Sequence, residues 1–215
     1  IRKKVEENKI NNLDIHTYHS LGKQHYDIQC HTDDKIRNIL STDKQLIRGG
    51  KKYDIIVQDE TQDCTMIYYK LLRKYIVDSG SERAMVLILG DKHQSVYEFK
   101  NSDNRFLSLG RELWMNMNNR ETYNMTLRES FRVTKPIASF INNVMLGNER
   151  IVSNKDGPMV EYIRHNIWTV HNKITKGILN MMKQKGITPN DIFILAGSVK
   201  NSSGPLRKLE NMLVS

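Results

Sequence analysis

Two adjacent acids, Asp59 and Glu60, are the residues of this sequence with the clearest capacity for chemistry. They come one residue after an apolar run, and the stretch from Tyr53 to Asp63 reads Y-D-I-I-V-Q-D-E-T-Q-D. A carboxylate at the end of a strand can hold Mg²⁺ on a nucleotide, and a second carboxylate beside it can orient or deprotonate water. The pair therefore indicates either a site that hydrolyses a nucleotide or, as the simpler alternative, a solvated acidic turn.

Three further segments contain residues that could work with these acids. The apolar run from Met85 to Leu89 also ends in an acid, because it continues as G-D-K-H-Q-S-V-Y-E-F up to Phe99. Leu127 to Arg132 reads L-R-E-S-F-R and leads into a predicted helix. Before the acids, Thr17 to Ser20 reads T-Y-H-S.

In this order, the four segments resemble motifs of the UvrD/Rep-type superfamily 1 DNA helicases. T-Y-H-S resembles motif Ib, which is usually T-F-H-S, and D-E-x-Q-D resembles motif II. G-D-x-x-Q-S-V-Y-x-F resembles motif III, where Q-S-I-Y is usual, and L-x-x-S-F-R resembles motif IV, where N-Y-R-S is usual. Motif III is the most specific of them. The resemblance implies an α/β fold with a RecA-like P-loop NTPase parallel sheet flanked by helices, plus the beginning of a second RecA-like domain.

The resemblance also implies a role for each polar residue in ATP hydrolysis. Asp59 would hold Mg²⁺ through water, and Glu60 would be the base that positions the attacking water. Gln94 would sense the γ-phosphate, while Asp91 would support its loop or the Mg²⁺ shell. Arg132 would stabilise the transition state as an arginine finger. The alternatives are a surface carboxylate, a loop glutamine and an arginine paired with the nearby Glu129.

A second set of residues is implied to contact DNA. Phe99 occupies the position of an aromatic that stacks on a base, and Tyr97 could pack beneath the nucleotide or join the stack. Lys100 could hold a phosphate. Thr17 and His19 would contact phosphates, which adds affinity without sequence information. The alternative for Phe99 is an aromatic residue of the core.

Two strands must place the acids, and the sequence predicts both. Ile55 to Val57 and Met85 to Leu89 do not alternate with polar residues, which is typical of strands buried on both faces of a parallel sheet. Ligands of such sheets bind beyond the carboxyl ends of the strands. The spacing of apolar residues predicts an amphipathic helix over Thr65 to Val77, between the strands. Upstream, Leu13 to Tyr18 alternates like a further strand.

The domain organisation follows from the resemblance. Residues 1–122 are predicted to form part of the first motor domain (1A), with a short accessory segment at about 24–52 that has room for a helix and loops or a small hairpin. Residues 123–215 are predicted to begin the second domain (2A). The patterns there predict helices and strands in this order: a helix capped by Thr134, a strand at 159–163, a helix at 170–182 stopped by Gly186, a strand at 192–196 and a helix at 202–214.

Composition limits the possible partners and compartments. The formal net charge of +9 favours a polyanionic partner, and the hydrophobic fraction of 39% fits a globular protein. No apolar stretch approaches the length of a membrane span. Cys30 and Cys64 form no metal-type pair and suggest free thiols in a reducing compartment. We therefore expect a location with the DNA inside a cell: the cytoplasm of a prokaryote, a nucleus or a viral factory.

The expected function is that of an ATP- and Mg²⁺-dependent helicase or translocase on single-stranded or partially duplex DNA, in company with repair or replication proteins. No G-x-x-x-x-G-K-[ST] phosphate loop occurs in the sequence, and the family's last motifs are missing. The sequence thus resembles a fragment, which alone should hydrolyse ATP poorly. One alternative is a catalytically inactive DNA-binding or scaffold protein derived from a helicase. Another is a motor attached to a nuclease or repair complex.

Overall fold

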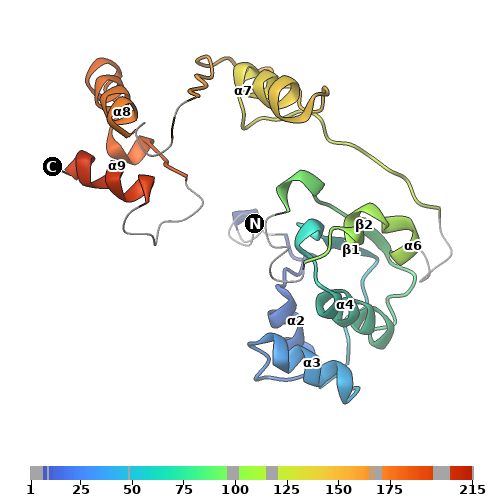
Figure 1. Ribbon diagram of the computed structural model, residues 1–215. Helices are drawn as coiled ribbons and strands as arrows, with labels where there is room; N and C mark the ends of the chain where they lie inside the picture. Colours follow the sequence, from blue (N-terminus) through green and yellow to red (C-terminus); the bar gives the residue numbers. More distant parts are fainter. Residues whose placement is uncertain are drawn as a thin grey trace. The chain divides into compact units, whose positions relative to one another are not determined.

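The computed structural model describes residues 7–8, 10–47, 49–95, 102–114, 121–164, 166, 171–195 and 204–214 (Figure 1). It divides into two compact units, Ile1–Met125 and Thr126–Ser215. Their identity as motor domains stays a prediction.

A small parallel sheet forms the centre of the first unit. Strand β1 (Ile55–Gln58) pairs with β2 (Met85–Ile88), so that Ile55 lies opposite Met85 and Gln58 opposite Ile88. Helix α4 (Met66–Asp78) connects the two strands. The predicted parallel strands and the helix between them are therefore confirmed, and the described residues form a mixed fold of helices and a two-stranded parallel sheet.

Helix α4 is the element around which the core of this unit packs. Its Leu71 and Tyr75 are buried against Ile36 and Ile39 of α3 (Asp33–Ser41) and against Leu21 of α2 (Tyr18–His25). Burying an aliphatic side chain of this size contributes about 1.5–3 kcal/mol. The end of α2, helix α3 and loops make up the described part of the segment predicted as accessory, residues 24–52, and no hairpin occurs among these described residues.

The strand predicted at Leu13 to Tyr18 is wrong. Residues 13–17 have no regular structure, and α2 begins at Tyr18 with Thr17 as its N-cap. The backbone N–H of Ser20 donates to Thr17 Oγ1 at 3.2 Å, and the Thr17 N–H donates to Ser20 Oγ at 3.0 Å. These local bonds favour a helix start and prevail over the short alternation of apolar residues.

The expectation that both faces of the sheet are buried is also wrong for the described residues. On one face, Val86 and Ile88 pack against a cluster that includes Tyr69 and Trp114. The side chains of the other face are exposed: Ile55 (55%), Val57 (51%), Met85 (51%) and Leu87 (41%). Successive side chains of a strand point to opposite faces, and no described element covers the second face.

Two short helices complete the described part of the first unit. They are α5 (Arg105–Ser108) and α6 (Gly110–Trp114). The indole N–H of Trp114 donates to the Phe106 carbonyl at 3.0 Å, and the Tyr69 hydroxyl donates to the Leu113 carbonyl at 2.7 Å. Both helices are thereby fixed to α4 on the side of the sheet that is covered.

Helices predominate in the second unit. Helix α7 (Lys135–Phe140) starts after Thr134 with Pro136 in its first turn and continues as the π-helix η5 (Ile141–Leu146). Helix α8 (His171–Lys185) ends before Gly186, which has a φ of 63°, and after η6 (Pro189–Asp191) comes α9 (Pro205–Val214). These helices confirm the predicted ones, although the Thr134 side chain makes no capping hydrogen bond to α7. No described helix is long and apolar enough to cross a membrane.

The strands predicted in this unit are not formed by its described residues. Residues 159–163 and 192–195 have no regular structure, and Ala196 lies outside the described residues. A single isolated bridge joins Glu129 and Val152 in parallel. Apolar side chains alone do not make a strand, because a strand needs a neighbour that satisfies its backbone groups.

Candidate active site

The predicted catalytic acids, Asp59 and Glu60, lie at the carboxyl end of β1, and Asp91 lies after the carboxyl end of β2. Asp59 follows β1 directly, and the backbone connects the turns after both strands. The Leu89 N–H donates to the Gln58 carbonyl, and the Thr61 N–H donates to the Leu89 carbonyl, both at 2.9 Å. The sheet thus holds the two predicted motifs side by side, at the edge where parallel sheets bind their ligands.

Glu60 has an uncommon backbone conformation. Its φ of 51° and ψ of 42° lie in the left-handed region, where Asp43 is the other described residue that is not a glycine. Such a conformation costs about 1–2 kcal/mol and persists where neighbours hold it. Here the Glu60 N–H donates to Asp59 Oδ1 at 3.0 Å. The turn leads into the short helix η1 (Thr61–Asp63) and leaves both carboxylates exposed.

Gln62 connects the two turns, a role that sequence reasoning missed. Its side chain is buried, with 1% exposed. Gln62 Nε2 donates to Glu60 Oε2 at 2.6 Å, and Gln62 Oε1 accepts the Asp91 N–H at 3.0 Å. The feature of the sequence that could have indicated this role is the glutamine of D-E-x-Q-D, which stands two residues after a candidate base.

Asp91 organises the turn after β2. Its Oδ1 accepts the His93 N–H and its Oδ2 accepts from Gln94 Nε2, both at 2.9 Å, which caps the short helix η2 (Lys92–Gln94). Of the two roles predicted for Asp91, support of its loop and a place in the Mg²⁺ shell, this geometry fits the support of the loop. The exposed Gln94 amide is held by one hydrogen bond and can exchange it for a ligand oxygen.

The side chains at the sheet edge could supply few ligands to a metal ion. No group of three or more His, Cys, Asp or Glu side chains that could hold an ion occurs among the residues that the structure describes. Asp59 can supply one carboxylate. Mg²⁺ is commonly held in this way, by one or two carboxylates with water and phosphate oxygens as its other ligands. Asp59 therefore fits Mg²⁺ that arrives with a nucleotide.

The residues predicted to contact DNA phosphates have other partners in this structure. The Thr17 hydroxyl caps α2, and His19 Nε2 lies 3.0 Å from Asp33 Oδ1. The Tyr68 hydroxyl donates to the same oxygen at 2.9 Å, and burial together with this bond raises the pKa of Tyr68 to about 12. His19 would have to leave Asp33, or share it, to reach a phosphate.

Three predicted DNA contacts, Tyr97, Phe99 and Lys100, lie outside the described residues.

A hydrogen bond joins the segment that follows Thr17 to the acid turn. The Tyr18 hydroxyl donates to Cys64 Sγ at 3.7 Å, and Cys64 directly follows η1. Burial raises the pKa of the Cys64 thiol, which makes it a weak nucleophile.

Arg132 belongs to the second unit and is exposed. Its backbone N–H donates to Ser130 Oγ at 3.4 Å, while its side chain makes no ion pair with another described residue. Glu129, the alternative partner, instead accepts from Asn154 Nδ2 at 3.0 Å. The alternative pairing of Arg132 with Glu129 is therefore not formed among the described residues.

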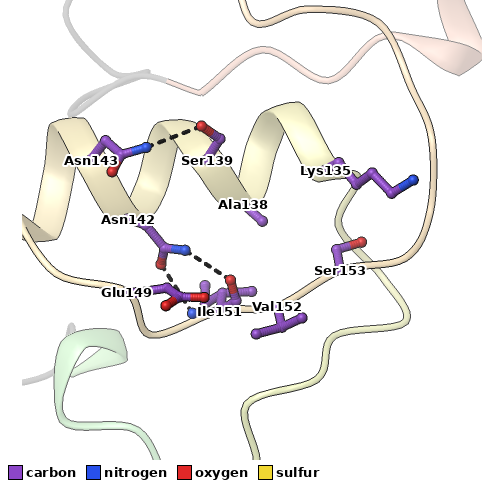
Figure 2. Close-up of a pocket in the computed structure, with 9 residues that line it drawn as sticks. All are labelled: Lys135, Ala138, Ser139, Asn142, Asn143, Glu149, Ile151, Val152 and Ser153. Atoms are coloured by element: carbon purple, nitrogen blue, oxygen red, sulfur yellow. Dashed lines mark hydrogen bonds between the residues drawn. The ribbon is translucent and has the colours of Figure 1, made fainter.

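The second unit also contains a pocket of about 270 Å³ beside α7 and η5 (Figure 2). Asn142 points from η5 toward the segment after Glu149: its Nδ2 donates to the Ile151 carbonyl at 2.8 Å, and its Oδ1 accepts from the Arg150 and Ile151 N–H groups at 3.0 Å. Lys135 pairs with Asp156 at 2.8 Å. The amide of Asn142 and the ammonium of Lys135 therefore already have partners within the protein, and we assign no ligand to this pocket.

Comparison with known proteins supports the reading of the motifs. Residues 27–112 match the family model of the UvrD/REP helicase N-terminal domain. The chain is 23% identical over 190 residues to a protein of Mycoplasma pneumoniae described as "Probable DNA helicase II homolog", a match that covers 82% of this chain and 26% of that protein. The family match includes the acid turn and Gln94, whereas Thr17, His19 and Arg132 lie outside it.

Proposed function

We propose that this chain, which is similar to UvrD/Rep-type DNA helicases, forms part of an ATP-dependent motor that moves on single-stranded DNA. The chain spans about a quarter, 26%, of the curated relative that it matches, so the activity proposed is that of a larger protein. The observation that carries the proposal is the pair of turns at one sheet edge, where Glu60 and Asp91 are joined through Gln62. The β1–α4–β2 unit is consistent with a RecA-like sheet.

In this proposal, hydrolysis uses the groups at the sheet edge. Asp59 would hold Mg²⁺, which when bound neutralises charge on the β- and γ-phosphates. Glu60 would accept a hydrogen bond from the attacking water and take its proton. The Gln94 amide would leave Asp91 for a γ-phosphate oxygen, and Asp91 would keep the turn in place. Positioning and charge contribute most of the catalysis in phosphoryl transfer.

Arg132 is proposed to act on the γ-phosphate as an arginine finger. Its exposed guanidinium can bind two oxygens of the γ-phosphate at once. Binding of ATP would then draw Gln94 and Arg132 to the same phosphate, and hydrolysis would release them. Alternation between these two states is what we propose to move the chain along DNA.

Single-stranded or partially duplex DNA is the proposed substrate, and the net charge of +9 supports it. Thr17 and His19 would contact phosphates, Tyr97 and Phe99 would stack on bases, and Lys100 would bind a phosphate. Contacts of this type are independent of sequence, which suits a protein of DNA repair or replication. Binding should weaken steeply as salt is raised, because counterions are released on binding.

The test is the ATPase activity of the native product of the gene that encodes this chain, with and without single-stranded DNA. We expect turnover that DNA stimulates and that Glu60→Gln lowers by about 10²–10⁴-fold, the usual contribution of a general base. Glu82→Gln, the same change at an exposed acid before β2, should leave turnover intact. Binding of DNA without any turnover would refute the motor and favour the inactive binding protein.

A further inference from the structure

Gln62 is the buried polar residue of the site to which neither the motif resemblance nor the proposed reaction gives a task. Both ends of its amide are used: the NH₂ group donates to Glu60 at 2.6 Å, and the oxygen accepts from the Asp91 backbone at 3.0 Å. A bond from an amide to a charged carboxylate is stronger than one between neutral groups. With 1% of the side chain exposed, water cannot easily replace either partner.

The two bonds of Gln62 are part of a longer path. Asp91, whose N–H is held by Gln62, accepts from the Gln94 side chain at 2.9 Å. Glu60 and Gln94 are therefore connected through two intermediate residues, with a hydrogen bond at each step. A displacement of the turn after β2 must move Gln62, and Gln62 must then move the Glu60 carboxylate or lose its bond to it.

Close packing surrounds the Gln62 side chain. A Cβ on Gly90 would lie 2.5 Å from Gln62 Oε1 and 3.2 Å from the Thr61 nitrogen, so the turn after β2 approaches the amide as closely as a glycine allows. Thr61 beside it is fully buried, with 0% exposed. The amide is thus fixed by close contact as well as by its two hydrogen bonds.

We propose that Gln62 is a positioning residue that sets the Glu60 carboxylate for catalysis and couples it to the turn that carries Gln94. This inference rests on the proposed function, because it assumes that Glu60 acts as the base. Gln62 itself touches neither water nor nucleotide in this role. Its removal should therefore affect turnover far more than it affects the binding of ATP.

Two substitutions distinguish the contribution of the amide NH₂ group from that of the amide oxygen. Gln62→Met keeps the approximate volume and removes both hydrogen bonds. Gln62→Glu keeps an acceptor for the Asp91 N–H, but it can donate to Glu60 only when one of the two carboxyls is protonated. Two carboxylates at this distance share a proton, so their apparent pKa values separate and the upper one rises.

The measurement is steady-state ATPase of the native gene product, saturated with single-stranded DNA, from pH 6 to pH 9. Gln62→Met should lower kcat by about 10²-fold, as expected for a displaced catalytic group, with the KM for ATP and the binding of a fluorescent ATP analogue little changed. Gln62→Glu should be as impaired as Gln62→Met at high pH and should recover activity as the pH is lowered. Gln58→Met, which removes another buried amide that lies near Tyr18 and Cys64, is the control for packing.

The outcomes distinguish this inference from the function on which it rests. Absence of DNA-stimulated turnover in the wild-type protein refutes the proposed function. Wild-type turnover together with a Gln62→Glu variant that keeps the wild-type kcat and pH profile overturns the role of Gln62 alone. Where Gln62→Met fails to fold, as judged by circular dichroism and ATP-analogue binding, the pH profile of Gln62→Glu decides.

Discussion

The acids at the sheet edge and Arg132 are held in very different ways. Around the acids, a hydrogen bond fixes the Glu60 backbone, the buried Gln62 amide holds the Glu60 carboxylate, and Asp91 fixes its own turn. Arg132 is fixed through its backbone to Ser130 alone, while its side chain is exposed and makes no ion pair with another described residue.

This difference indicates which part of the proposed active site is already arranged before a ligand binds. Two neighbouring strands with a helix between them suffice to build the acid edge, because all its contacts are within one unit. The exposed Arg132 side chain has about 2 kcal/mol of rotamer entropy to lose, so we expect the opposite charge of a ligand to order it. Substitutions at the acid edge should therefore alter both stability and turnover, whereas substitution of Arg132 should alter turnover alone.

The largest effect is expected for Arg132→Ala. Loss of an arginine finger lowers kcat by about 10³-fold or more, and we expect this in the DNA-stimulated ATPase of the native gene product. The thermal unfolding temperature should not change, because the side chain is exposed. Arg128→Ala is the matched control, since this nearby guanidinium already pairs with Glu149 at 3.6 Å. Equal losses of kcat in both variants would contradict a specific role for Arg132.

The cores of the two units provide the next comparison. Leu71 of α4 is fully buried, with 0% exposed, whereas 61% of Val144 in η5 is exposed. Leu71→Ala should lower the free energy of unfolding by about 2–5 kcal/mol, because it leaves a cavity. Val144→Ala should change it by less than about 0.5 kcal/mol. Urea denaturation followed by circular dichroism measures both, and a large cost at Val144 would show that the second unit buries this face in solution.

A smaller effect is expected where the two turns meet. Gly90→Ala places a methyl group 2.5 Å from Gln62 Oε1, so that the amide or the turn must shift. Overpacking of this kind should lower the free energy of unfolding, measured by urea denaturation, by about 1–3 kcal/mol. The same change at Gly110, where a Cβ would meet no atom within 4 Å, should be neutral or stabilising by about 0.4–1 kcal/mol. Equal stabilities of the two variants would mean that the turns are not held together.

Local patterns predicted those parts of the molecule that depend on local physics. The apolar runs before Asp59 and Asp91 form the parallel strands, and the stripe between them forms α4. Gly186 ends α8 with a positive φ, which glycine adopts at little cost. The acids and Gln94 could be placed at one sheet edge for the same reason, since the carboxyl ends of parallel strands lie together.

The errors came from contacts that no pattern contains. Alternation predicted a strand before Tyr18, but the reciprocal bonds of Thr17 and Ser20 start a helix there. The role of Gln62 depends on which backbone lies beside it after the sheet has formed, and Asp91 comes from a distant part of the sequence. Burial of both sheet faces depends on neighbours that the described residues do not supply.

The smallest effect expected is a pH dependence confined to the first unit. Burial, and then the charge of His16, lower the pKa of His25, whose ring lies 4.6 Å from that of Tyr75. The unfolded chain therefore binds a proton more readily than the folded one. This contribution to stability is complete above the unfolded pKa of about 6.5 and is lost as the pH falls through it toward the lowered folded value. The urea midpoint of the first unit should accordingly be lower at pH 5.5 than at pH 7.5.

The contributions of two other groups near His25, Asp14 and His16, must be distinguished from that of His25 itself. Asp14 partly offsets the effect, because its negative charge raises the pKa of His25. The pKa of Asp14 is itself lowered by its hydrogen bonds to Lys51 and Tyr53, so its own contribution disappears only below about pH 4, outside this window. His25→Phe keeps a ring against Tyr75 and removes the proton site. It should flatten the decline between pH 7.5 and 5.5, whereas an unchanged decline would exclude His25 as its source.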